Sequence, residues 1–183
     1  MGDTQERVYP LTLEPTMSLA LQHDRVGVIH YVLRNDAGVE LDSTVGRDPL
    51  AYLHGHRNIV PGLEAALVGT VAGDALTTSV APADGYGERR GSGARRIRRN
   101  ELPKEPPLQV GMPVHGQDPE GQFFTLWVTQ IRGAWVWVDR NHPLAGQTLH
   151  FDVTVLKVRE ALETEKRNGR ANGVDGYSPG GVR

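Results

Sequence analysis

Tyr52-Leu53-His54-Gly55-His56, followed by Ile59-Val60-Pro61-Gly62-Leu63-Glu64, is the stretch that decides the fold. The first part is predicted to end an apolar strand in a tight glycine turn. The second part begins a short helix, because proline suits the first helical turn, where its missing N–H costs no hydrogen bond. Leu63, Ala66 and Leu67 then follow at the spacing of one apolar helical face.

Strands are expected on both sides of this helix. Residues 26–33 and 149–158 alternate strongly, and alternation in the first places Ile29, Tyr31 and Leu33 on one face. Shorter strands are expected at 39–43, 49–53 and 74–80, and a hairpin at 122–131 and 134–139. Strand 149–158 has no obvious partner in the middle of the chain, so we expect it to pair with the first half.

This pairing predicts an α+β fold in which one domain interrupts another. Residues 20–88 and 141–162 form the discontinuous domain, residues 89–140 an inserted domain, and residues 1–19 an N-terminal extension that is loosely ordered or wraps as an edge strand. Residues 163–183 are polar and glycine-rich, and are expected to form a disordered tail.

Composition excludes several classes of protein. The 183 residues carry a net charge of -2, which is no signature of nucleic-acid binding for the chain as a whole. Cysteine is absent, which excludes disulfides and thiol nucleophiles and fits a reducing compartment. We see no signal-peptide pattern and no apolar run near the ~20 residues of a membrane span, and therefore expect a cytoplasmic protein without membrane contact.

Several motifs in fixed order resemble the SlyD-like branch of the FKBP-type peptidyl-prolyl isomerases. They are Leu53-His54-Gly55-His56, Ala83-Asp84-Gly85-Tyr86-Gly87, Asn141-His142-Pro143-Leu144-Ala145-Gly146-Gln147 and Leu149-His150-Phe151. The resemblance covers about residues 18–165. It implies an antiparallel sheet wrapped around one helix, an inserted mainly-β insert-in-flap domain that grips unfolded chains, and rotation of prolyl bonds as the activity.

The resemblance also implies which residues form the site. Tyr31, Asp42 and Tyr86 fall at catalytic positions. The proline pocket would be lined by Leu50, Ile59, Val60, Leu63 and Phe151. Pattern alone favours ordinary core side chains for the pocket residues and a solvated strand end for Asp42. For Tyr86 it fits a loop-anchoring tyrosine equally well. Because Val60 precedes a helix start, its backbone N–H is a further hypothetical donor to the substrate carbonyl.

Neither a metal nor a cofactor is expected. The tail lacks the histidines and cysteines of metal-binding members of this branch, so nickel storage is not supported. His54 and His56 alternate on an expected strand and would point to opposite faces, which disfavours a shared metal but leaves open that one of them faces the pocket. His142 is the one tempting third ligand.

The inserted region offers two surfaces. Phe123, Phe124 and Trp127 are the expected contacts for unfolded chains, although most aromatic residues in so small a domain should be core. The arginine-rich stretch from Arg89 to Arg99 is expected to be a solvated flap, with binding of acidic chains or RNA as the alternative. A monomer is expected. The competing reading of the whole chain is a binding module for unfolded chains without turnover.

Overall fold

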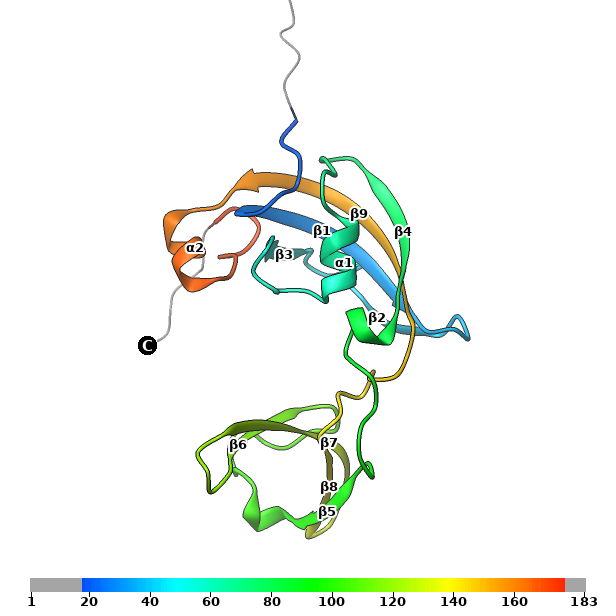
Figure 1. The fold of residues 1–183 in the computed structure, drawn as a ribbon, viewed down its shortest axis with the longest axis vertical. Coiled ribbons are helices and arrows are strands. Elements are labelled where there is room, and N and C mark those ends of the chain that lie inside the picture. Colours follow the sequence, from blue (N-terminus) through cyan, green and yellow to red (C-terminus); the bar gives the residue numbers. More distant parts are fainter. Residues whose placement is uncertain (1–17, 177–183) are drawn as a thin grey trace, which may run out of the picture.

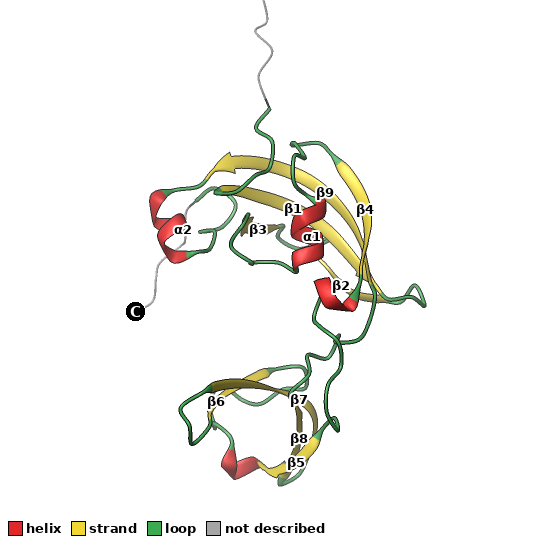
Figure 2. Ribbon diagram, in the orientation of Figure 1, coloured by secondary structure: helices red, strands yellow, loops and turns green. Residues whose placement is uncertain are grey.

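The computed structural model describes residues 18–176, so residues 1–17 of the N-terminal extension expected over residues 1–19 lie outside this range. Its strands form two separate antiparallel sheets, shown in Figures 1 and 2. One has five strands and the other four. The predicted α+β fold, with an antiparallel sheet and a short helix, is confirmed.

The five-stranded sheet is built from the two ends of the chain. It contains β1 (Arg25–Arg34), β2 (Glu40–Ser43), β3 (Leu50–Leu53), β4 (Ala75–Val80) and β9 (Leu149–Glu160). β9 lies between β1 and β4, while β2 and β3 pair in succession with the other edge of β1. The expected pairing of the last long strand with the first half of the chain is therefore confirmed.

Helix α1 (Pro61–Ala66) packs against one face of this sheet. Pro61 begins the helix as predicted, and Leu63 and Leu67 point into a core that contains Ile29, Leu33 and Phe151. The helix approaches β4 so closely that a Cβ at Gly62 would lie 2.6 Å from Val80 Cγ1. Glycine at this position therefore allows the contact that fixes α1 on the sheet.

The four-stranded sheet is formed by the intervening segment. Its strands are β5 (Arg95–Arg98), β6 (Pro113–Gln117), β7 (Phe123–Arg132) and β8 (Trp135–Asp139), in the order β5-β8-β7-β6. Its core is aliphatic rather than aromatic, with Val128, Val136 and Val138 fully buried. Figure 1 shows this sheet set apart from the other and joined to it by two chain segments.

The two connecting segments are held together by polar contacts. The Arg90 backbone N–H donates to Asn141 Oδ1 at 2.8 Å, and Asn141 Nδ2 donates to the Arg90 carbonyl at 2.9 Å. Arg89 pairs with the buried Asp139 at 2.6 Å. The entry to and exit from the four-stranded sheet are thus clamped side by side.

The prediction of a disordered tail from residue 163 is wrong for residues 163–176. Helix α2 (Glu163–Asn168) follows β9, and Ala161, Ala171 and Val174 pack on Val26, Val28 and Leu53. These three side chains lie on the opposite face of the sheet from the α1 core, so the segment covers apolar surface that would otherwise meet water. Residues 177–183 lie outside the described range.

Within residues 18–176, the α-helices α1 and α2 have six residues each, and neither is long and apolar enough to span a bilayer.

Candidate active site

A pocket of about 200 Å³ opens between α1 and the five-stranded sheet. Its walls come from β1, β2, β3, β9, the start of α1 and two loops, so segments far apart in the chain build it. The lining residues are Tyr31, Leu33, Asp42, Leu50, Asn58, Ile59, Val60, Leu63, Tyr86 and Phe151.

All eight residues expected at the site line this pocket, while Leu33 and Asn58 are additional. Leu33 shares its strand face with Tyr31, so the alternation contained the signal for it. Asn58 lies in the turn before α1, where its Oδ1 accepts the Leu53 N–H at 3.1 Å and its Nδ2 donates to the Gly169 carbonyl at 2.8 Å. No local pattern indicates the long-range contact with Gly169.

The floor of the pocket is apolar and densely packed. Leu63 and Phe151 are 3% and 4% exposed, and both belong to the main core cluster. The Tyr31 ring meets Phe151 edge to face at a centroid distance of 6.2 Å. Leu63 and Phe151 are therefore both core residues and pocket-lining residues. One side of each side chain packs in the core, and the other side forms the pocket floor.

Tyr31 and Asp42 form a hydrogen-bonded pair at one rim. The Tyr31 hydroxyl donates to Asp42 Oδ2, and Arg47 Nη2 donates to Asp42 Oδ1 at 3.3 Å. Burial, followed by the hydrogen bond to the Asp42 carboxylate, raises the pKa of Tyr31 well above its ordinary value. The phenol therefore remains protonated and stays a hydrogen-bond donor throughout the neutral range.

Tyr86 stands at the pocket mouth, on the loop that follows β4. Its ring stacks on His142 with centroids 3.7 Å apart and the planes 4° from parallel, and Trp127 packs edge-on against His142 at 4.3 Å. Burial, and secondarily the charge of Asp42, raises the pKa of Tyr86. Within residues 18–176 its hydroxyl has no hydrogen-bond partner, so the phenol is available to a bound molecule.

The backbone at Val60 adds a second free donor. Val60 is the N-cap of α1 in an extended conformation, and its carbonyl accepts the N–H groups of Leu63 and Glu64. Its own N–H meets no acceptor in the part of the chain that the structure describes. The pocket thus combines an apolar floor with two hydrogen-bond donors near its rim.

The histidines of the turn do not reach the pocket. His54 is buried, with its Nδ1 3.2 Å from the Tyr52 hydroxyl, and burial lowers its pKa. His56 contacts Asp24 instead. The strand ends at Leu53, so the expected alternation of His54 and His56 along a strand is wrong, and neither residue lines the site.

The aromatic residues expected to contact unfolded chains differ in exposure. Phe123 is 84% exposed, whereas Trp127 is half-buried against His142. Phe124 packs against the core of the four-stranded sheet, with the Arg140 guanidinium 5.6 Å above its ring. The exposed aromatic surface of β7 is thus narrower than the sequence suggests.

The arginine-rich stretch is partly a regular strand rather than only a flap. Arg95, Arg96 and Arg98 lie on β5 and are exposed, with Arg96 and Arg98 stacked over the Trp135 ring at 4.2 and 5.3 Å. Arg98, Arg99 and Lys104 line a cavity of about 620 Å³ beside Trp135. The stretch therefore presents concentrated positive charge next to an aromatic ring.

Comparisons with known proteins agree on one family. Residues 19–156 match the profile of the FKBP-type peptidyl-prolyl cis-trans isomerases. The chain is 37% identical to the "FKBP-type peptidyl-prolyl cis-trans isomerase SlyD" of Vibrio cholerae, over 86% of this chain and 78% of the relative. The proteins of the same name from Treponema pallidum and Escherichia coli K12 are 38% and 36% identical, over 75% and 82% of this chain and 77% and 76% of theirs.

Proposed function

Since the chain belongs to the FKBP-type peptidyl-prolyl cis-trans isomerase family, we propose that it accelerates rotation about X–Pro bonds of unfolded and partly folded polypeptides in the pocket beside α1. The observation that carries this assignment is the convergence of Leu63, Phe151, Tyr86 and the Tyr31–Asp42 pair on one opening. An apolar floor suits the proline ring, and the rim donors suit the carbonyl groups on either side of it.

The energy required is modest. Amide resonance opposes rotation with a barrier of ~18–20 kcal/mol, and uncatalysed isomerisation takes ~10–100 s. A thousandfold acceleration needs a reduction of only ~4 kcal/mol. A dry apolar floor disfavours the charge-separated resonance form that gives the C–N bond its double-bond character. Hydrogen bonds that strengthen as the amide twists supply the remainder, because only differential binding of the transition state speeds the reaction.

Each rim group then has a role. The Tyr86 hydroxyl and the Val60 N–H donate to substrate carbonyl oxygens. Asp42 orients Tyr31 through the hydrogen bond between them and places a negative charge beside the twisting amide. Leu50, Ile59 and Val60 close the walls against water.

We assign residues 89–140 a second role as a chaperone domain that holds unfolded chains near the pocket, with residues 20–88 and 141–162 as the isomerase domain. Phe123 supplies exposed apolar surface on β7, and Trp127 of the same strand is half-buried. Trp127 also reaches Tyr86 through His142, so the binding surface and the pocket mouth are adjacent. The working state proposed is a monomer in the cytoplasm, where nascent chains are the substrates.

A second candidate partner rests on the arginines of β5. Exposed guanidinium groups beside the Trp135 ring fit an acidic chain or single-stranded RNA, which pairs phosphate charge with stacked bases. Such binding would weaken steeply with added salt.

Refolding of a proline-limited model protein tests the main proposal. Wild-type chain is expected to accelerate the slow phase at substoichiometric amounts. Asp42→Ala and Tyr86→Phe are expected to slow the catalysed rate while binding of the unfolded chain is kept. Acceleration only near equimolar amounts would instead identify a holding protein without turnover.

A further inference from the structure

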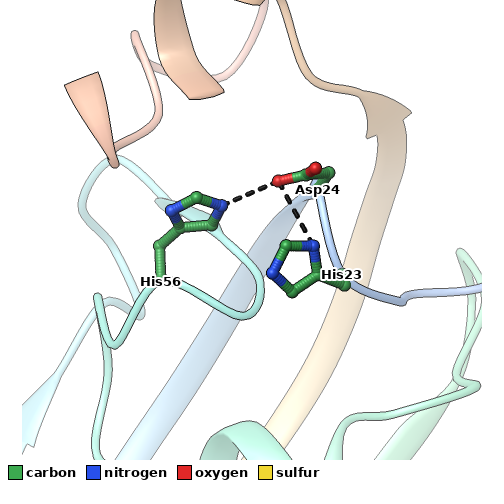
Figure 3. A group of neighbouring side chains, drawn as sticks. All are labelled: His23, Asp24 and His56. Atoms are coloured by element: carbon green, nitrogen blue, oxygen red, sulfur yellow. Dashed lines mark hydrogen bonds and ion pairs between the residues drawn. The ribbon is translucent and has the colours of Figure 1, made fainter. Parts of the chain in front are cut away.

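His23, Asp24 and His56 converge where β1 begins, outside the prolyl pocket. Figure 3 shows one oxygen of the Asp24 carboxylate in contact with a nitrogen of each imidazole ring. One potential ligand atom from each residue lies within 4.8 Å of the others. From this cluster we infer that the chain has a binding site for a divalent cation that prefers imidazole, of which Zn²⁺ and Ni²⁺ are the representatives.

The distances match those that such a cation needs. Asp24 Oδ1 lies 3.4 Å from His23 Nδ1 and 2.7 Å from His56 Nε2. Zinc bonds of ~2.0–2.2 Å separate neighbouring tetrahedral ligands by roughly 3.3 Å. The first pair already has this separation. The second pair, Asp24 Oδ1 and His56 Nε2, is joined by a hydrogen bond. The distance between these two atoms has to increase by roughly 0.6 Å when the cation replaces the shared proton.

The backbone brings the three side chains together. The Asp24 N–H donates to the His54 carbonyl at 3.1 Å, and the His54 N–H donates to the Arg25 carbonyl at 2.9 Å. These bonds tie the turn that carries His56 to the start of β1. Asp24 itself has a left-handed backbone with φ of 63°, a conformation that aspartate tolerates better than most residues.

Gly55 is the feature that lets His23 join the cluster. Its φ is +87°, and a Cβ built there would lie 2.3 Å from His23 Cδ2. Any side chain at position 55 would therefore displace the His23 ring. The two imidazoles lie with centroids 5.2 Å apart. The glycine turn thus lets two imidazole nitrogens approach the same carboxylate oxygen.

The donor set selects the cation. Two imidazoles and one carboxylate suit Zn²⁺, Ni²⁺ and Cu²⁺, whereas Mg²⁺ and Ca²⁺ prefer oxygen ligands alone. Lys166 of α2 is a positive charge that acts on Asp24, but Glu163 pairs with it at 2.9 Å. Three protein ligands leave at least one coordination position for water.

The bound cation would link the start of β1 to the turn that leads into α1. The three ligands come from positions up to 33 residues apart (56 − 23), so the unfolded chain does not present them together. Binding to the folded state alone stabilises it by mass action. Zn²⁺ would therefore raise the melting temperature of the protein.

Calorimetric titration of the untagged full-length chain with Zn²⁺ and Ni²⁺ tests the inference. Wild type is expected to bind one equivalent, and His23→Ala and His56→Ala to weaken binding by roughly tenfold or more. Asp24→Asn keeps the side-chain shape at the left-handed position and is expected to weaken binding as well. His150→Gln is the matched control, because His150 also pairs with a carboxylate, Asp36, at 2.8 Å. Prolyl isomerisation of a short peptide confirms that each variant is folded.

Loss of the equivalent in the first three variants, with retention in His150→Gln, supports the site. Binding that is unchanged in His23→Ala, or that His150→Gln removes equally, would place the metal elsewhere and overturn the inference. A wild-type chain that binds neither cation would overturn it as well. None of these results bears on the prolyl pocket, so the inference and the proposed function fail separately.

Discussion

At the scale of single residues, Tyr86 is held by stacking rather than by its hydroxyl. His142 lies flat against one face of its ring, and Trp127 braces His142 from the side. The stacking fixes the position of the hydroxyl without occupying it in a hydrogen bond. A donor to an incoming substrate carbonyl needs both properties. This arrangement makes His142 a positioning residue for the pocket.

Replacing His142 tests that role. His142→Ala removes the stacking partner and is expected to lower kcat/KM on a short prolyl peptide by roughly 3–10-fold, because Tyr86 loses its fixed orientation. His142→Phe restores a flat ring and is expected to recover most of the activity. Equal activity of the alanine variant and the wild type in a peptide isomerisation assay would show that the stack does not position Tyr86.

At the scale of elements, α2 is held by one buried ion pair. Glu165 is fully buried and accepts two hydrogen bonds from Arg159, at 2.7 and 2.8 Å. The backbone N–H groups of Leu162 and Asn172 donate to the same carboxylate. The segment from 161 to 176 therefore folds around this charge and covers Val26, Val28 and Leu53.

Glu165→Gln is expected to detach this segment. Removing one partner of a buried pair costs ~3–5 kcal/mol, which exceeds what a short covering segment can supply. Hydrogen exchange is expected to show lost protection over residues 161–176, while α1 and β4 stay protected. Glu163→Gln, which alters an exposed pair with Lys166, is the control and is expected to leave protection unchanged. Protection retained in Glu165→Gln would contradict the assignment.

The same carboxylate predicts how stability depends on pH. Hydrogen bonds from Arg159 lower the pKa of Glu165 to about 2 from an ordinary value of 4.5. Because the folded-state pKa is the lower one, the stabilising contribution is complete above pH 4.5 and is lost as the pH falls towards 2. Wild type should lose protection of the segment over this range, and the glutamine variant should show no such step.

At the scale of the whole molecule, the four-stranded sheet is joined to the rest by two clamped segments. The Arg90–Asn141 hydrogen bonds lie at the junction, and Gly146 donates to the Gly87 carbonyl at 2.8 Å just outside it. The five-stranded sheet, α1 and every lining residue of the pocket come from outside residues 89–140. Removal of the inserted region therefore leaves the pocket residues in the chain.

Deleting residues 89–140 and joining Glu88 to Asn141 by a short glycine–serine linker separates the two proposed activities. Activity on short peptides is expected to be largely kept, whereas catalysis of proline-limited refolding falls sharply because the holding surface is gone. Phe123→Ser in the full chain is the milder variant and should reduce only binding of unfolded protein. An equal fall of both activities in the deletion would contradict the division of labour.

The positions of all strands except β5 and β6, the helix starting at Pro61 and the antiparallel fold class were predictable from sequence, because alternation and proline geometry act within a few residues. Strands β5 and β6 were missed, because neither segment shows a strong apolar alternation. The pocket residues were predictable only through a family resemblance, since pattern alone fits core side chains as well. The aliphatic core of the four-stranded sheet was not predicted, because composition does not tell which of Val138, Phe124 and Trp127 is buried in the core.

The amino-acid sequence by itself determined where the strands of the five-stranded sheet, the β7–β8 hairpin and α1 form, since these preferences depend on neighbouring residues. The tertiary structure alone decided the ordered α2 segment, the stacking of His142 on Tyr86 and the meeting of His56 with Asp24. Each of these depends on residues distant in the chain, such as the pair His56 and Asp24. Their proximity is set by sheet pairing and burial of apolar faces, which no local period encodes.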